Sequence, residues 1–234
     1  MKKIFKSVVG VEVLNGEHFV SPLQMSLTLL TTICLILSNI IVVKPIDLFG
    51  ISSLPNTCAL LVFPVTYILS DVFSEVYGYR WSRLTATWAF LGTIICSILF
   101  ALTIALPGNA SWTNQEALVS ILGYTPKIAF ASVLAFWFGD WANDKAFVLI
   151  KKALPNDKAF FVRAIGSSLF GKYVDGAIFT FIGLSHLPMS VKLAMVATCP
   201  FVQICLETIL FPVTNLVKNK VQKVEDRYAT KSDE

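Results

Sequence analysis

Long apolar stretches, separated by short polar segments, dominate the chain. Six can be marked, at approximately residues 22–43, 54–74, 82–106, 127–150, 164–185 and 190–217. Each can supply the roughly 20 residues that a helix needs to cross about 30 Å of hydrocarbon. The fourth stretch is the weakest, because Asp140, Asp144 and Lys145 interrupt it. The pattern predicts an all-α, polytopic membrane protein with six transmembrane helices.

The composition agrees with lipid as the solvent of this chain. Of its 234 residues 55% are apolar and only 15% are charged, and the mean hydropathy is +0.69. Soluble domains usually carry about a quarter charged residues, so too few are present to cover a surface in water. We divide the chain into a cytoplasmic N-terminal segment (1–21), a transmembrane domain (22–217) and a cytoplasmic, solvated C-terminal tail (218–234). Polar residues interrupt the N-terminal segment, so we interpret it as an amphipathic surface segment and not as a cleavable signal.

The distribution of basic residues predicts the orientation of the helices. With the N-terminus inside, fourteen of the nineteen lysines and arginines fall on the cytoplasmic side, two lie within the spans and three lie outside, namely Lys44, Lys127 and Lys192. Basic residues concentrate in cytoplasmic loops of membrane proteins. We therefore expect both termini in the cytoplasm, and the net charge of +4 reflects this bias and not a nucleic-acid partner.

A few residues predict local features of the helices. Pro64 falls inside the second span, and Pro200 and Pro212 fall inside the sixth, where each removes a backbone donor. Ser167 and Gly171 make a small face suited to close helix contact. The five cysteines fall in or beside the spans without a Cys-x-x-Cys pair, and the chain has two histidines. We therefore expect no disulfide, metal site or cofactor.

Ionisable residues within the spans are the candidates for chemistry, because a charge at the bilayer centre costs about 2.5–3.5 kcal/mol on insertion scales. Five acids stand against two bases, Lys145 and Lys172, and the acids are Asp71, Asp140, Asp144, Asp175 and Glu207. The resulting charge of −3 exceeds what internal pairing can neutralise. It favours a proton pathway or a cationic or donor-rich guest.

Spacing places several polar residues on shared helix faces. Asp71 and Glu75 are four residues apart, and Asp140 lies on one face with Asn143 and Asp144. Lys172 and Asp175 are three residues apart and could pair, and Gln203 shares a helix face with Glu207 and Thr214. We expect Arg80 and Arg83 at the inner surface, where they pair with Glu75 or lipid phosphate.

Four ordered blocks resemble the queuosine precursor transporter family. The resemblance spans about residues 30–217. Its blocks are Ser70-Asp71-Val72-Phe73-Ser74-Glu75-Val76-Tyr77-Gly78-Tyr79-Arg80, then Gly139-Asp140-Trp141-Ala142-Asn143, then Arg163 to Ser167 with Gly171 and Asp175, and finally Glu207 with Pro212 and Thr214. Lys172 and Asp144 depart from the family pattern, which leaves their roles open.

The resemblance implies a fold, a function and a site. It implies a six-helix bundle similar to the substrate-binding components of vitamin uptake transporters, in a bacterial inner membrane. It also implies import of 7-cyano- and 7-aminomethyl-7-deazaguanine for tRNA queuosine synthesis. The expected ligand is small, planar and purine-like, and the residues expected to bind it are Asp71, Glu75, Asp140, Asn143, Asp175 and Glu207.

Two other functions stay open at this point. One is a vitamin-capturing subunit driven by a partner ATPase, since the chain has no Walker A motif of its own. The other is an intramembrane aspartyl-type hydrolase using Asp140 with Asp175 or Asp71, although the leading interpretation is not an enzyme. The sequence also leaves open the energy source, the preferred deazaguanine and a homo-oligomeric state.

Overall fold

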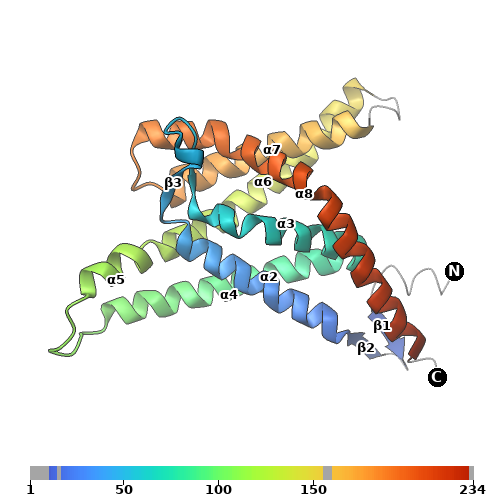
Figure 1. Cartoon of the computed structure of the whole chain (residues 1–234), viewed down its shortest axis with the longest axis horizontal. Helices are drawn as coiled ribbons and strands as arrows, with labels where there is room; N and C mark the ends of the chain where they lie inside the picture. Colours follow the sequence, from blue (N-terminus) through green and yellow to red (C-terminus); the bar gives the residue numbers. More distant parts are fainter. Residues whose placement is uncertain (1–10, 15–16, 155–159, 232–234) are drawn as a thin grey trace. The chain divides into compact units, whose positions relative to one another are not determined.

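The computed structural model describes residues 11–14, 17–154 and 160–231, most of which are helical (Figure 1). The helical elements in chain order are α2 (Pro22–Ile41), the 3-10 turns η1 (Leu48–Gly50) and η2 (Cys58–Leu61), α3 (Phe63–Val72), the π-helical turn η3 (Phe73–Tyr77), α4 (Tyr79–Ala105), α5 (Gln115–Leu122), α6 (Thr125–Ala153), α7 (Phe160–Gly183) and α8 (Met189–Lys231). Two antiparallel ribbons complete the chain, β1 (Val11–Leu14) with β2 (Glu17–Val20) and β3 (Pro45–Asp47) with β4 (Pro55–Thr57).

The prediction of helices is confirmed for five of the six apolar stretches. The first, third, fourth and fifth match α2, α4, α6 and α7 to within about four residues at each end, and the sixth begins with α8. Such differences are expected because helix ends fray and their assignment varies by one or two residues.

The second stretch, 54–74, is not the single helix that we predicted. It begins as strand β4, which pairs with β3, and becomes α-helical only at Phe63. Pro64 therefore lies in the first turn of α3, where its missing donor costs nothing, and not inside a helix as we predicted. With ten residues, α3 is about 15 Å long and cannot cross a bilayer alone.

Within the described residues, four helical segments are long and apolar enough to cross a membrane. They are Pro22–Ile41, Tyr79–Ala105, Gln115–Ala153, which joins α5 to α6, and Met189–Asp226. The count of six spans and the orientation of the termini therefore stay predictions.

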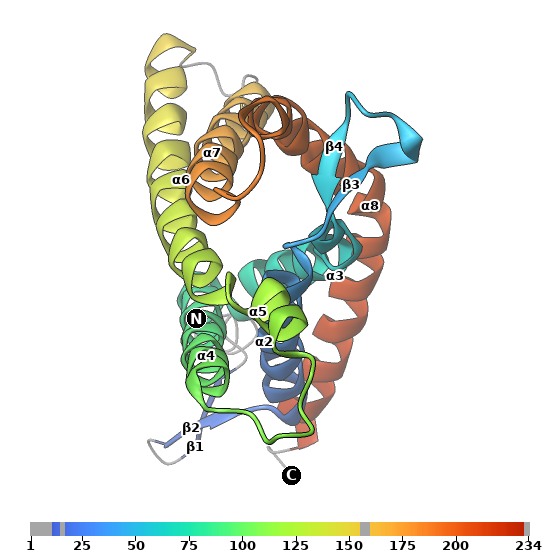
Figure 2. The same ribbon diagram turned by 90° about the vertical axis from the view of Figure 1, so that its left-hand side faces the viewer.

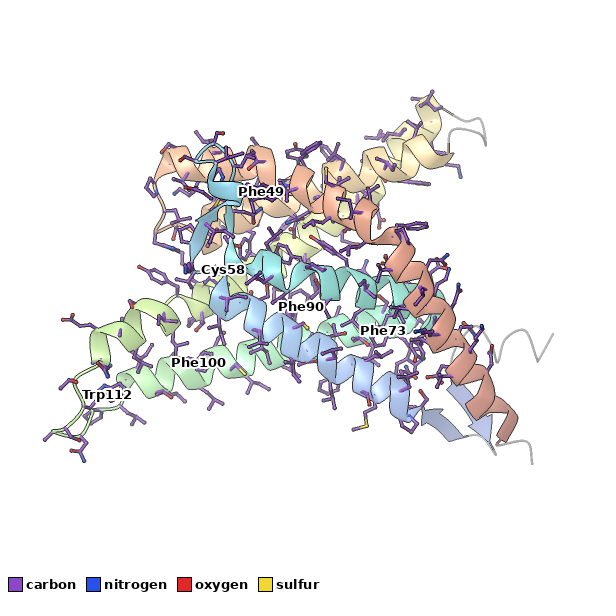
Figure 3. All side chains as sticks on the ribbon, viewed as in Figure 1. Phe49, Cys58, Phe73, Phe90, Phe100 and Trp112 are labelled. Carbon is purple, nitrogen blue, oxygen red and sulfur yellow. The ribbon has the colours of Figure 1, made fainter. Side chains whose placement is uncertain are left out.

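The backbone divides into two compact units. Unit 1 comprises residues 1–38, 61–93 and 206–234, and unit 2 comprises residues 39–60 and 94–205. In unit 1, Val72, Phe73, Val76 and Tyr77 form a buried apolar cluster with Val221 (Figure 3 labels Phe73). In unit 2, α6 packs against α7, and the two helices lie side by side (Figure 2).

Both ends of the chain differ from the prediction. Residues 11–14 and 17–20 pair as a β-ribbon, where we expected an amphipathic surface segment; residues 1–10 lie outside the described part. The segment from residue 218 is not a solvated tail, because α8 continues to Lys231 and buries Val221 and Glu225. Pro200 and Pro212 both lie inside α8, as predicted.

Candidate functional site at the contact of α6 and α7

The contact between α6 and α7 has an antiparallel register that four glycines define. A Cβ atom placed on Gly166 would meet Ile150, and one placed on Gly183 would meet Ala131. Between these points, Gly171 lies against Asn143 and Gly139 lies against Asp175. Steps of seven, four and eight residues back along α6 thus match steps of five, four and eight residues forward along α7, so the two helices keep the same faces together.

The two helices approach most closely at Gly139 and Gly171. A Cβ atom on Gly171 would lie 2.8 Å from the carbonyl oxygen of Gly139, and one on Gly139 would lie 3.1 Å from the carbonyl oxygen of Gly171. Small residues at a helix contact allow backbones to approach in this way. The close helix contact that the sequence predicted at Ser167 and Gly171 is confirmed, and Ser167 is buried.

This crossing places two hydrogen-bond acceptors near each other. The Cβ atom of Asn143 lies 2.8 Å from the position of a Cβ on Gly171, and that of Asp175 lies 2.8 Å from the position of a Cβ on Gly139. Because Gly139 and Asn143 are four residues apart, the two polar side chains flank the crossing about one helical turn from each other.

Neither acceptor has a donor among the residues that the structure describes. The Oδ1 atom of Asn143 is buried without a hydrogen-bond partner. The carboxylate of Asp175 feels the charge of Lys172, one turn away, but has neither an ion pair within 4 Å nor a hydrogen bond in the described part of the chain. A buried acceptor without a partner costs about 1–3 kcal/mol. The crossing therefore suits a guest that brings hydrogen-bond donors.

The six predicted site residues divide equally between the two units. Asp140, beside Gly139 on α6, belongs to unit 2 with Asn143 and Asp175. Unit 1 holds the other three, which are Asp71 on α3, Glu75 on η3 and Glu207 on α8. The structure brings Asn143 and Asp175 to the same contact of α6 and α7.

Glu75 has a different partner from the arginines that we expected. Its carboxylate lies 3.8 Å from the Nζ atom of Lys218 on α8. Arg83 instead packs over the ring of Tyr79, with its Nε donating to the phenol oxygen at 2.9 Å. Both Asp71 and Glu75 are exposed to the surroundings of the chain.

One polar pair in unit 2 was missed from the sequence. The hydroxyl of Ser132 on α6 donates to the Oδ1 atom of Asn39 at 3.0 Å, and the Nδ2 atom of Asn39 is buried without an acceptor. Ser132 shares a face of α6 with Gly139 and Asn143, since seven and eleven residues are close to whole numbers of turns. The feature of the sequence that could have indicated this pair is Asn39 itself, a lone amide near the end of an apolar stretch.

The first part of α8 supports the crossing from the other side of α7. The hydroxyl of Tyr173 donates to the carbonyl oxygen of Ala197 at 3.1 Å, and Gly176 lies against the buried ring of Pro200. A larger residue than glycine at position 176 would bring a Cβ within 3.4 Å of that ring. Lys172 and Asp175 therefore lie on a helix that packed neighbours hold in place.

The described residues contain no group of three or more His, Cys, Asp or Glu side chains placed to hold a metal ion.

Several apolar helices of this length define an α-helical, multi-pass membrane protein. The family described as "Putative vitamin uptake transporter" matches residues 57–217, and the chain belongs to this family. It is thus a transporter by family.

A named relative gives a narrower comparison. The chain is 26% identical over 201 residues to a protein of Bacillus subtilis (strain 168) named "Probable queuosine precursor transporter". The match covers 83% of this chain and 82% of the relative. No solved structure matches the chain.

Proposed function

We propose that this protein imports queuosine precursors, namely 7-cyano- and 7-aminomethyl-7-deazaguanine, across the bacterial inner membrane. The observation that supports this most strongly is the buried Oδ1 atom of Asn143, which has no donor in the described part of the chain, beside Asp175 at the crossing of α6 and α7. The name of the Bacillus subtilis relative supports the same substrate class.

The chemistry of a deazaguanine complements these acceptors. The guanine-type ring presents neighbouring N–H donors on one edge, and a carboxylate can accept two of them side by side. An amide oxygen can accept one more. In our proposal Asp175 accepts from the ring edge and Asn143 from a second donor, while Asp140 attracts the cationic aminomethyl group. Asp71, Glu75 and Glu207, all in unit 1, stay predicted binding residues.

Replacing either acceptor should reduce import. We expect Asn143→Ala and Asp175→Asn each to lower uptake about tenfold or more, because a hydrogen bond to a buried or charged acceptor contributes about 1.5–3 kcal/mol. The measurement is the queuosine content of tRNA in cells that cannot make the precursor and are supplied with low concentrations of it.

Asp144→Asn is the matched control, since Asp144 lies on the same helix as Asn143 but is exposed. Its uptake should equal that of the unmodified protein at equal membrane abundance. Undiminished queuosine in cells carrying the Asn143→Ala and Asp175→Asn variants would contradict the proposed site.

The family description favours one other candidate, which is capture of a vitamin. A vitamin with N–H donors on a flat ring would meet the same two acceptors. Competition for uptake of labelled deazaguanine distinguishes the two, because a preferred vitamin would displace the deazaguanine at lower concentration than the unlabelled deazaguanine itself.

A further inference from the structure

The last part of α8 packs into unit 1, although it lies beyond the segment that defines the family. The family match ends at residue 217, whereas α8 continues without a break to Lys231 (Figure 1). In this extension Val221 is 7% exposed and Glu225 is 8% exposed. A solvated tail would bury neither of them.

The buried face of the extension contacts the π-helical turn η3. Val221 belongs to the same apolar cluster as Phe73, Val76 and Tyr77, and Val217 packs against that cluster. Leu23 and Leu27 of α2 reach the cluster as well. The extension, η3 and the start of α2 therefore share one small core.

Glu225 joins these three elements through hydrogen bonds. Its Oε1 atom accepts from the phenol of Tyr77 at 2.8 Å and from the hydroxyl of Ser21 at 2.6 Å. The hydroxyl oxygen of Ser21 accepts in turn from the backbone N–H of Gln24 at 2.9 Å, in the first turn of α2. Distances this short are typical of hydroxyl donors bonded to an ionised carboxylate.

Tyr77 is suited to remain the donor in this arrangement. Burial raises the pKa of its phenol far above the ordinary value, and the hydrogen bond to Glu225 and its negative charge raise it further. The phenol therefore stays protonated at physiological pH and can donate to Glu225 continuously. Its ring is 1% exposed, so water does not compete for the proton.

The turn that is held in this way carries a proposed binding residue. Glu75 lies in η3 two residues before Tyr77, and its carboxylate is 3.8 Å from Lys218 in the extension. π-helical turns are rare, and they occur often at functional sites. The turn ends at Gly78, whose φ of 84° is accessible to few other residues. The hydrogen bond of Tyr77 to Glu225 thus anchors the end of the turn that carries Glu75.

We propose that Glu225 is a positioning residue for transport: it holds η3, and with it Glu75, in the conformation that receives the substrate. The proposal rests on the proposed function, because it requires Glu75 to contact the substrate. It predicts that the extension of α8 is part of the transport machinery.

The test compares uptake kinetics of Glu225→Ala, Glu225→Gln and Tyr77→Phe. We expect the Ala and Phe variants to raise the KM for deazaguanine uptake about tenfold, with little change in maximal rate per folded protein, because one charge-assisted hydrogen bond is lost. Glu225→Gln should restore most of the affinity, since its amide oxygen still accepts from Tyr77. The double variant Tyr77→Phe with Glu225→Ala should be no worse than Glu225→Ala alone, because Glu225→Ala already removes the bond from Tyr77 as well as the bond from Ser21.

Asp226→Asn is the matched control, since Asp226 is the exposed neighbour of Glu225 and accepts from Gln222. A KM for Tyr77→Phe and Glu225→Ala equal to that of the unmodified protein, or additive effects in the double variant, would overturn the positioning role. If instead the unmodified protein imports no deazaguanine, the proposed function itself fails. The two failures are therefore distinguishable.

Discussion

His186 lies in the connection between α7 and α8, outside the predicted spans. Its ring packs on that of Tyr124, with centroids 4.5 Å apart. His186 is exposed; partial desolvation nevertheless lowers its pKa, the charges of Lys127 and Lys192 lower it further, and a hydrogen bond to the backbone of Val43 partly opposes them. The folded protein thus binds a proton at this position less readily than the unfolded chain does.

The shifted pKa of His186 predicts a pH dependence of stability. Below the ordinary histidine value of 6.5 the unfolded chain takes up the proton first, so the stability that is present above that pH is lost as the pH falls. Thermal unfolding in detergent should therefore occur at lower temperature in mild acid, and His186→Gln should flatten this dependence. Identical pH profiles for the variant and the unmodified protein would contradict the prediction.

At the level of single residues, the sequence indicates which side chains are candidates for chemistry, but not which residues they contact. Acids in apolar stretches stand out because burying charge is costly, so Asp140 and Asp175 could be selected without a structure. The partners could not be predicted, since Lys218 reaches Glu75 and Glu225 reaches Tyr77 across long separations in the chain. Glu225 itself lies in a charged segment whose composition resembles that of a solvated tail.

At the level of elements, the crossing of α6 and α7 depends on the absence of side chains at two positions. Gly171→Ala would bring a Cβ within 2.8 Å of the Gly139 backbone, which cannot move without separating the helices. We expect a loss of about 1–3 kcal/mol in stability, as is usual for overpacked contacts, and weaker uptake because the two acceptors move apart.

Gly166→Ala is the matched control on the same helix. Its Cβ would meet only the terminal methyl group of Ile150, at 3.2 Å, and a flexible side-chain end can shift. Thermal unfolding of the two variants in detergent tests the prediction. Equal stability of Gly171→Ala and Gly166→Ala would show that the close approach does not matter.

The elements themselves were predictable where hydrophobicity alone decides them. Long apolar runs gave α2, α4, α6 and α7 to within a few residues. The prediction of one helix for the second stretch was wrong because composition does not distinguish an apolar strand from an apolar helix. The pairing of Pro55–Thr57 with Pro45–Asp47 also depends on a partner segment. The prediction of a solvated tail from residue 218 was wrong because packing against η3, and not the composition of the segment, buries part of it.

At the level of the whole molecule, the positive-inside pattern predicts both termini in the cytoplasm. Reporter fusions test this directly: a C-terminal fluorescent protein that folds only in the cytoplasm should be bright, and a periplasmic alkaline phosphatase at the same position should be inactive. The opposite result, with active phosphatase at the C-terminus, would overturn the orientation that we predict.

The central claim is that Asn143 and Asp175 bind a deazaguanine at the crossing of α6 and α7. Equilibrium binding to purified protein in lipid nanodiscs tests it most directly, with 7-cyano- and 7-aminomethyl-7-deazaguanine as ligands and guanine as the comparison. We predict saturable binding of a deazaguanine that is tighter than that of guanine, is lost in Asn143→Ala and persists in Asp144→Asn. Absence of deazaguanine binding to the unmodified protein, or equal binding to Asn143→Ala, would contradict the claim.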